Sequence, residues 1–221
     1  MIENIYSYLQ DIAPSAYFIA QGIFTTFKYG IISVFFGLIL GSLTGVYKLS
    51  ANIIIRNLAN FYTSIFRGTP LLIQLSVIYF GIPSITDWKI SAFLAGIIAF
   101  SLNSGAYISE IIRGGILAID KGQFEAAKVL NIPKYYIYKD IIAPQIIRNI
   151  LPSLVNELIN MLKESSIISM IGEADLMYRA QLVSAETYRY FTPMLIAAFY
   201  YYLMVSALSY ISNSLETKLK I

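Results

Sequence analysis

Long apolar stretches recur along this chain of 221 residues, and they constrain its fold more than any other feature of the sequence. A membrane-spanning helix needs about 20 mainly apolar residues. Only 13% of the residues are charged and 57% are hydrophobic, whereas a soluble domain usually carries about 25% charged residues. We therefore predict one all-α membrane domain over residues 1–221. Its five predicted spans cover about residues 23–47, 54–82, 90–112, 151–171 and 193–212.

The distribution of lysine and arginine predicts the orientation of these spans. Five spans place the two termini on opposite sides of the membrane. With the C-terminus inside, ten basic residues fall in the inner segments and four in the outer ones. The inner ten are Lys48, Arg56, Arg113, Lys121, Lys128, Lys134, Lys139, Arg148, Lys218 and Lys220; the outer four are Lys28, Lys89, Arg179 and Arg189. Because cytoplasmic loops are enriched in basic residues, we predict the N-terminus outside and the C-terminus in the cytoplasm.

Several kinds of chemistry lack their usual residues in this sequence. The chain has no histidine, which is the commonest general base and the commonest metal ligand. It has no cysteine, which excludes disulfides, thiol catalysis and metals bound by cysteine. It contains no GxxxxGK[ST] phosphate loop and no GxSxG nucleophile motif. The basic residues are spread along loops and form no patch of the kind that binds nucleic acid. These absences predict a protein that is not an enzyme, needs no cofactor or metal of its own and binds no nucleic acid.

The longest inner segment, about residues 113–150, mixes charges with regularly placed apolar side chains. Asn131 fits the end of a helix because asparagine tolerates the left-handed conformation. Pro133 fits the first turn of the next helix, where its missing N–H costs nothing. We predict a helix, a sharp turn and a second helix at the cytoplasmic face. The pattern alone leaves open an amphipathic helix at the membrane surface or a docking surface for a partner.

Polar residues repeat at helical spacing within three of the predicted spans. The stripes comprise Thr63, Arg67 and Gln74; Asn103, Tyr107 and Glu110; and Asn156, Asn160 and Lys163, with Glu157 and Glu164 one step around the helix. Polar residues are costly in a membrane and usually face protein or water. Three stripes together favour a path for a solute. The alternative is pairing between helices, in which Glu110, Glu157 or Glu164 neutralises Arg67 or Lys163.

Two further features shape the predicted spans. Gly37, Gly41 and Gly45 repeat every four residues on the first span, which lets a neighbouring helix approach closely. Gly68, Thr69 and Pro70 follow Arg67 in the second span. Proline lacks an N–H donor and clashes with the preceding turn, so these residues predict a helix break. A break is tolerated at membrane depth where it packs in protein or lines a cavity, as a gate would.

Three motifs in order resemble one known family. They are FRGTPLLIQLSVIYFGIP at residues 66–83, AYISEIIRGGILAIDKGQFEAAKVL at 106–130 and IIAPQIIRNILPSL at 141–154, followed by a similar stretch at 161–167. The likeness is to polar amino acid permeases of ATP-binding cassette importers, the group of histidine, glutamine and arginine permeases, and covers about residues 20–215. It implies the fold of a type I importer permease in the inner membrane of a prokaryote.

The resemblance also implies partners and a coupling segment. Such permeases pair with an identical or sister permease, rest on two ATPase subunits that bind the ATP, and receive an amino acid from an external binding protein. The resemblance assigns the coupling helix to the EAA sequence of Glu125, Ala126 and Ala127, with Lys128 and Asn131 following. Small alanines allow close approach of the ATPase. The family has glycine where this chain has Asn131, and the left-handed turn is expected to survive.

A site for an amino acid needs both signs of charge. We expect Lys163 or Arg67 to meet the carboxylate and Glu164 to meet the ammonium or a cationic side chain, with Asn103 and Asn160 supplying further hydrogen bonds. The alternative of a self-sufficient channel or secondary transporter is disfavoured because only one broken span and no internal repeat are found. A membrane enzyme is disfavoured by the missing catalytic motifs. The sequence identifies neither the amino acid nor the second permease.

Overall fold

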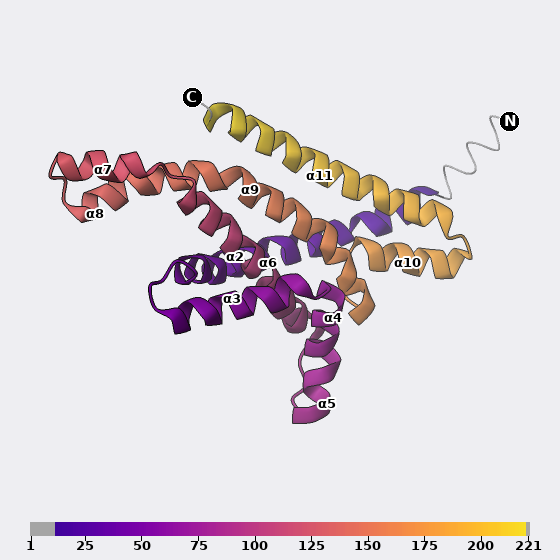
Figure 1. Ribbon diagram of the computed structural model, residues 1–221. Helices are drawn as coiled ribbons and strands as arrows, with labels where there is room; N and C mark the ends of the chain where they lie inside the picture. Colours follow the sequence, from indigo (N-terminus) through magenta and orange to yellow (C-terminus); the bar gives the residue numbers. More distant parts are fainter. Residues whose placement is uncertain (1–11, 220–221) are drawn as a thin grey trace.

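The computed structural model describes residues 12–219, and over that range it is helical, without strands (Figure 1). The helix that leads in runs continuously from Ile12 to Tyr47. The elements are α2 (Gly22–Tyr47), α3 (Ile53–Gly68), α4 (Leu71–Ser76), η1 (Val77–Gly81), α5 (Ile82–Thr86), α6 (Ala92–Leu117), α7 (Lys121–Val129), α8 (Lys134–Tyr136), η2 (Ile137–Ile142), α9 (Ala143–Glu164), η3 (Ser165–Ile171), α10 (Leu176–Thr187) and α11 (Phe191–Leu219).

Helices α2 and α6 pack closely along the glycine face predicted for the first span. A Cβ atom at Gly41 would lie 2.7 Å from the Cβ of Ile108, and one at Gly45 would lie 2.8 Å from the carbonyl oxygen of Ser109. Real Cβ atoms do not approach other atoms this closely. The prediction that these glycines admit a neighbouring helix is confirmed, and α6 is that helix.

The second predicted span is two helices that meet at a sharp angle. Helix α3 ends at Gly68, and the helical segment from Leu71 to Thr86 continues at 102° to it. Thr69 is extended, with φ −124° and ψ 145°, as expected for a residue before proline. Pro70 is extended in turn and precedes the new helix. The predicted break in the span over about 54–82 is confirmed, and the structure adds the angle at which the two halves meet.

The number of helices that could cross a membrane differs from the five predicted. By length and composition, three of the described helices are long and apolar enough, or four if the bent pair is one span. Helix α9, which covers much of the predicted fourth span, is not among them because its polar stripe lowers its apolar character. It also begins at Ala143, before the predicted boundary near residue 151. The multi-pass, all-α fold is nevertheless as predicted.

The segment between α6 and α9 is the predicted helix, turn and helix. After α7, Ile132 N–H donates to Ala127 O at 3.1 Å and Asn131 N–H donates to Lys128 O at 3.0 Å. This pair of bonds is a Schellman cap, which needs a left-handed residue. Asn131 supplies it with φ 53°, so its predicted conformation is confirmed. We call α7, this turn, α8 and η2 the hairpin.

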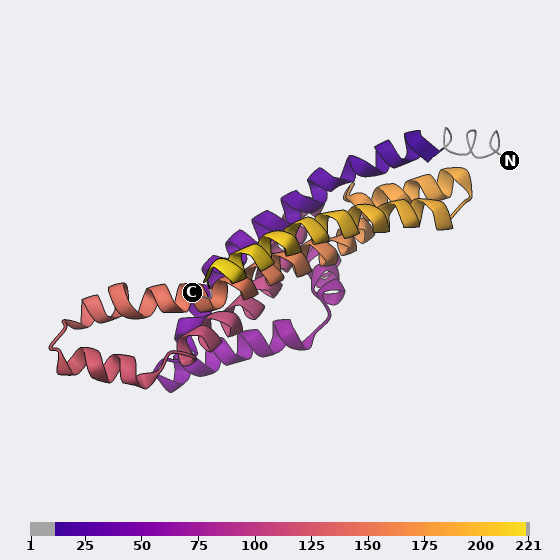
Figure 2. The ribbon, with the colours of Figure 1, turned by 90° about the horizontal axis from the view of Figure 1, so that it is seen from above.

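The hairpin lies at one end of the molecule (Figure 1 and Figure 2). Helix α11 ends on that side, whereas the start of the helix that leads into α2 and the loop between α10 and α11 lie at the opposite end in both views. The described chain therefore begins and ends at opposite ends of the helical body, the arrangement expected of a protein whose termini lie on opposite sides of a membrane.

Candidate functional site

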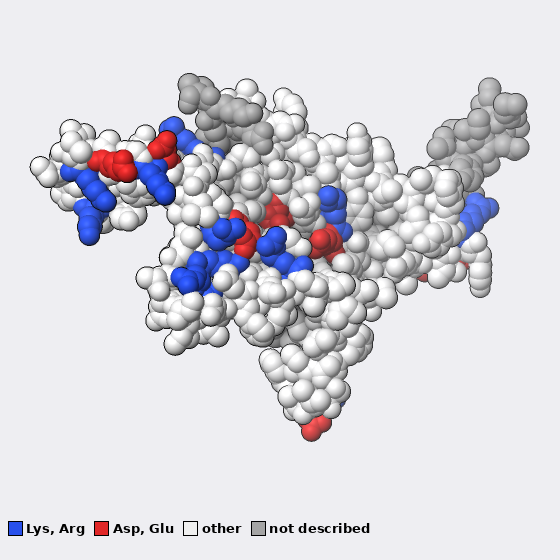
Figure 3. Space-filling model, in the orientation of Figure 1, with Lys and Arg blue, Asp and Glu red and all other residues white. Residues whose placement is uncertain are grey.

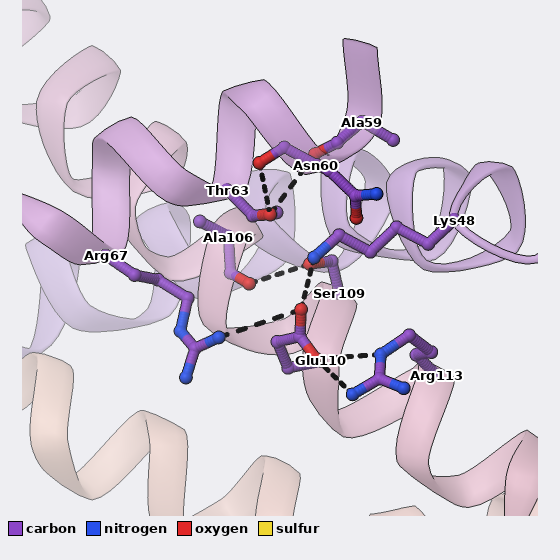
Figure 4. Close-up of polar contacts among 9 residues, drawn as sticks. All are labelled: Lys48, Ala59, Asn60, Thr63, Arg67, Ala106, Ser109, Glu110 and Arg113. Carbon is purple, nitrogen blue, oxygen red and sulfur yellow. Dashed lines mark hydrogen bonds and ion pairs between the residues drawn. The ribbon is translucent and has the colours of Figure 1, made fainter. Parts of the chain in front are cut away.

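One carboxylate on α6 gathers three cations near the break, and we call these four residues the Glu110 cluster (Figure 4). Lys48 caps the end of α2 and donates to Glu110 Oε1. Arg113, one turn along α6, donates from Nε to Glu110 Oε2 at 2.8 Å. Arg67, in the last turn of α3, places Nη1 3.6 Å from Oε1. Charges inside a membrane protein need partners. Glu110 is the shared partner of three cations and thereby connects α6 to the ends of α2 and α3.

Two buried amides hold the break between α3 and α4. The Asn103 side chain donates to Phe66 O at 3.0 Å and to Gln74 Oε1 at 3.2 Å. Gln74 Nε2 donates in turn to Phe66 O and Thr69 O, at 2.9 and 3.0 Å. These carbonyls lost their helical partners at the break, and unpaired buried carbonyls are costly. Asn103 therefore stabilises the break; its predicted place on a solute path stays a prediction.

The remaining break residues form the other side of this network. Thr69 Oγ1 donates to Ile65 O at 2.9 Å and accepts from Gln74 Nε2 at 3.0 Å. A Cβ atom at Gly68 would meet nothing within 4 Å, and Gly68 ends α3 without being enclosed. The predicted gate role of Gly68, Thr69 and Pro70 stays a prediction. The structure adds that this segment forms a bend held by hydrogen bonds.

A hollow of about 280 Å³ lies between α6 and α9. Its lining comprises Tyr107, Glu157, Asn160, Met161 and Glu164, and we call it the acidic hollow. Glu157 is only 5% exposed, and its Oε1 has no hydrogen-bond partner among the described residues. The Arg67 guanidinium lies 5.4 Å from the centre of the Tyr107 ring. Two carboxylates, an amide and a stacked guanidinium thus come together at one place.

The structure brings together three of the five residues predicted for the solute path and separates the others. Asn160 and Glu164 line the acidic hollow, and Arg67 stacks on Tyr107, which lines it as well. Lys163 instead lines a second hollow of about 260 Å³, with Ser166, Met177, Met194, Ala197, Ala198 and Tyr201. Adjacent residues on a helix point in different directions, so Lys163 and Glu164 face different neighbours.

Sequence reasoning did not place Tyr107 and Glu157 in the site, although both lie on the polar stripes. The signal that identifies them is spacing. Glu157, Asn160 and Glu164 are three and four residues apart and therefore share one face of α9. Tyr107 is likewise four residues from Asn103 on α6.

The predicted coupling residues lie on the hairpin but do not share one face. Glu125, Ala126 and Lys128 are exposed. Ala127 is only 2% exposed and belongs to the core of the hairpin, together with Ile137 and Ile142. Sequence reasoning expected Ala127 to give a partner close approach, and the structure corrects this: Ala127 gives η2 close approach to α7.

The apolar surface of the hairpin that is free for a partner lies at its tip. Val129 and Leu130, at the end of α7, are exposed, as are Tyr135 and Tyr138 across the turn. Charged side chains also gather over the hairpin and over the centre of the face shown in Figure 3, between broad areas without charge. An exposed apolar tip next to charges is typical of a protein interaction site.

Comparison with known proteins identifies the family. Residues 18–221 match the model of the binding-protein-dependent transport system inner membrane component. The putative glutamine transport system permease protein GlnP of Rickettsia conorii is 60% identical over 215 residues, 97% of this chain and 99% of the relative. The arginine transport system permease protein ArtQ of Bacillus subtilis is 47% identical over 207 residues, 94% of each chain.

A solved structure supports the same conclusion. The crystal structure of an amino acid ABC transporter with histidines has a chain that is 40% identical and superposes with a TM-score of 0.89, covering 95% of this chain and 97% of that one. The expected type I importer permease fold is therefore confirmed. The chain belongs to the family of inner membrane components of binding-protein-dependent transport systems: it is a multi-pass membrane transport protein, and not a catalytic one.

Proposed function

We propose that this chain is the permease subunit of an ATP-driven importer of amino acids, with a preference for cationic side chains. The observation that carries the proposal is the acidic hollow, which is lined by two carboxylates and by Tyr107, on which Arg67 stacks. The names of the relatives support the solute class, because they are permeases for glutamine and arginine, and the similar structure is an amino acid transporter with histidines.

The chemistry of the hollow matches an amino acid with a basic side chain. Arg67 offers a guanidinium for the carboxylate, which it can bind with two parallel hydrogen bonds. Glu157 and Glu164 offer two carboxyl groups, and Asn160 offers an amide. A neutral amino acid carries one ammonium group, which leaves one of the two carboxylates without a cation. A cationic side chain supplies the second positive charge.

Transport is coupled to ATP through the hairpin. The family relationship supports partnership with ATPase subunits and a solute-binding protein. In this proposal the exposed residues Glu125, Ala126 and Lys128, with the apolar tip, rest on an ATPase subunit that binds the ATP. Closure of the ATPases moves the hairpin and switches the permease between two packings that open the hollow to opposite sides. A ligand shifts such an equilibrium only by binding the two states differently.

The assembly lies in the inner membrane of a prokaryote, with the start of the described chain outside and the hairpin and C-terminus in the cytoplasm. The start of the first described helix and the hairpin lie at opposite ends of the molecule, which supports this orientation (Figure 2). A second permease, identical or a sister, completes the pathway, and an external binding protein delivers the amino acid. The permease itself holds no cofactor.

Uptake by the reconstituted complex tests the proposal. The complex of permease, ATPase and binding protein is assayed in proteoliposomes with L-arginine, L-histidine, L-glutamine and L-glutamate. Glu164→Gln and Glu157→Gln are compared with Glu186→Gln, which alters an exposed glutamate at the end of α10 that does not line the hollow. We expect the first two variants to lose about tenfold in arginine uptake, the factor for one charge-assisted hydrogen bond of about 1.4 kcal/mol.

The control and the yield of complex separate this role from a structural one. Glu186→Gln should transport as the unsubstituted protein does. The two hollow variants should assemble in normal amounts, and loaded binding protein should still stimulate their ATPase. Wild-type uptake of every amino acid by both hollow variants would remove the acidic hollow from the pathway.

A further inference from the structure

The Glu110 cluster contains more positive than negative charge. Glu110 faces Lys48, Arg67 and Arg113, so three cations share one carboxylate. They do not share it equally. The side chain of Lys48 is 6% exposed and that of Arg113 is 39% exposed, and both donate hydrogen bonds to Glu110. The side chain of Arg67 is 44% exposed, and its 3.6 Å contact is an ion pair without a hydrogen bond.

Arg67 connects the Glu110 cluster to Tyr107, a residue that lines the acidic hollow. Its guanidinium makes the long ion pair on one side and stacks on Tyr107 on the other. Tyr107 in turn lines the hollow with Glu157 and Glu164. Among the described residues the Arg67 side chain donates no hydrogen bond. Most of its capacity to donate hydrogen bonds is therefore unused, next to a side chain that lines the hollow.

We propose that Glu110 is the resting partner of Arg67 and that the carboxylate of the transported amino acid takes its place. This inference rests on the proposed function of the acidic hollow. Lys48 and Arg113 stay on Glu110 when Arg67 turns away, so the exchange leaves no carboxylate uncompensated inside the membrane. The cluster carries a surplus of positive charge, which favours the arrival of a second carboxylate, because that carboxylate brings the net charge of the cluster closer to zero.

The exchange also reaches the corner of the second span. Arg67 is in the last turn of α3, directly before the 102° bend. Of the two proposed partners of Arg67, Glu110 is part of α6 and the carboxylate of the amino acid moves with the solute. A change of partner at Arg67 therefore changes the charge contacts that hold the end of α3 against α6, and this links occupation of the hollow to the position of the break.

The proposal predicts that one substitution in the cluster increases the affinity for L-arginine. Substitutions that damage a structural ion pair, or a residue that touches solute, weaken solute binding. Glu110→Gln instead removes the competitor of the solute carboxylate and should strengthen the binding of L-arginine about fivefold, the factor for one partly exposed ion pair of about 1 kcal/mol. Arg113→Gln should weaken it by a similar factor, because fewer cations then share Glu110 and Arg67 is held more firmly.

The test is equilibrium binding of radiolabelled ligands to the purified permease–ATPase complex in lipid nanodiscs, without the binding protein. L-arginine is compared with agmatine, which keeps the guanidinium and the amine but lacks the carboxylate. Agmatine should bind no more tightly to Glu110→Gln than to the unsubstituted complex, and Arg113→Gln should leave its binding unchanged within about twofold. Size-exclusion profiles restrict the measurement to assembled complex.

Each result decides the matter. Tighter binding of L-arginine alone to Glu110→Gln, with weaker binding to Arg113→Gln, supports exchange at Arg67. Unchanged or weaker L-arginine binding to Glu110→Gln overturns it, as does an equal gain for both ligands. If Glu110→Gln does not assemble, unaltered L-arginine binding by Arg113→Gln overturns it. An unsubstituted complex that binds neither ligand overturns the proposed hollow itself, and the exchange with it.

Discussion

The same substitution should affect the stability of the hairpin very differently at its two adjacent alanines. Ala127 is 2% exposed and packs inside the hairpin core, whereas Ala126 is exposed. Leucine in place of Ala127 adds three carbon atoms where there is no space for them, and overpacking of this kind costs about 1–3 kcal/mol. A cost of about 2 kcal/mol raises the population of the opened hairpin about 30-fold. Leucine in place of Ala126 changes the stability of the hairpin by at most about 0.5 kcal/mol.

Limited trypsin digestion of the purified permease without its ATPase measures this difference, because the hairpin carries lysines at both ends of α7. Cleavage after Lys121 and Lys128, followed by mass spectrometry, should be much faster in Ala127→Leu and unchanged in Ala126→Leu. ATP hydrolysis stimulated by loaded binding protein should fall in both variants, in Ala126→Leu because added bulk separates α7 from the ATPase. Equal resistance to trypsin in Ala127→Leu and the unsubstituted protein would refute the assignment of Ala127 to the core.

Three further predictions follow from local geometry. Gly41→Ala should lower the yield and the melting temperature of the complex, because the new Cβ would lie 2.7 Å from Ile108, whereas Gly114→Ala, with nothing within 4 Å, should be neutral or stabilising. Asn131→Gly should preserve coupling, and Asn131→Val should destabilise the hairpin by about 1–2 kcal/mol because a β-branched residue resists positive φ; a Val variant with full ATPase stimulation would contradict this. Single cysteines at Thr187 and Lys128 should react with a membrane-impermeant maleimide from opposite sides, and labelling of both from one side would contradict the proposed orientation.

Features that depend on local sequence were predictable. The glycine repeat on α2 predicts close packing whatever the partner helix is, and Asn131 with the proline two positions later predicts a turn from backbone preferences alone. Pro70 likewise predicts that a helix breaks. The 102° angle was not predictable, since it depends on Asn103 and Gln74, which reach the freed carbonyls from outside the break.

Features that depend on which face of a helix meets which neighbour were not predictable. Ala126 and Ala127 are the same type of residue, and only the position of η2 makes Ala127 the buried one. Lys163 and Glu164 are adjacent and oppositely charged, so the sequence suggests one site. In the structure Glu164 faces α6, whereas Lys163 faces α10 and α11. The alternative of pairing between helices also proved partly right for Arg67, which contacts Glu110 and stacks on Tyr107, a residue that lines the acidic hollow.

ATP-driven accumulation of a labelled amino acid in proteoliposomes tests the central claim most directly. The permease is reconstituted alone, with its ATPase, and with the ATPase and the loaded binding protein, each with and without ATP. The account predicts accumulation of L-arginine against its gradient in the complete system with ATP, and none in any other combination. Uptake of the same size by the permease alone, or by the complete system without ATP, would show a self-sufficient channel or secondary transporter and would contradict the account.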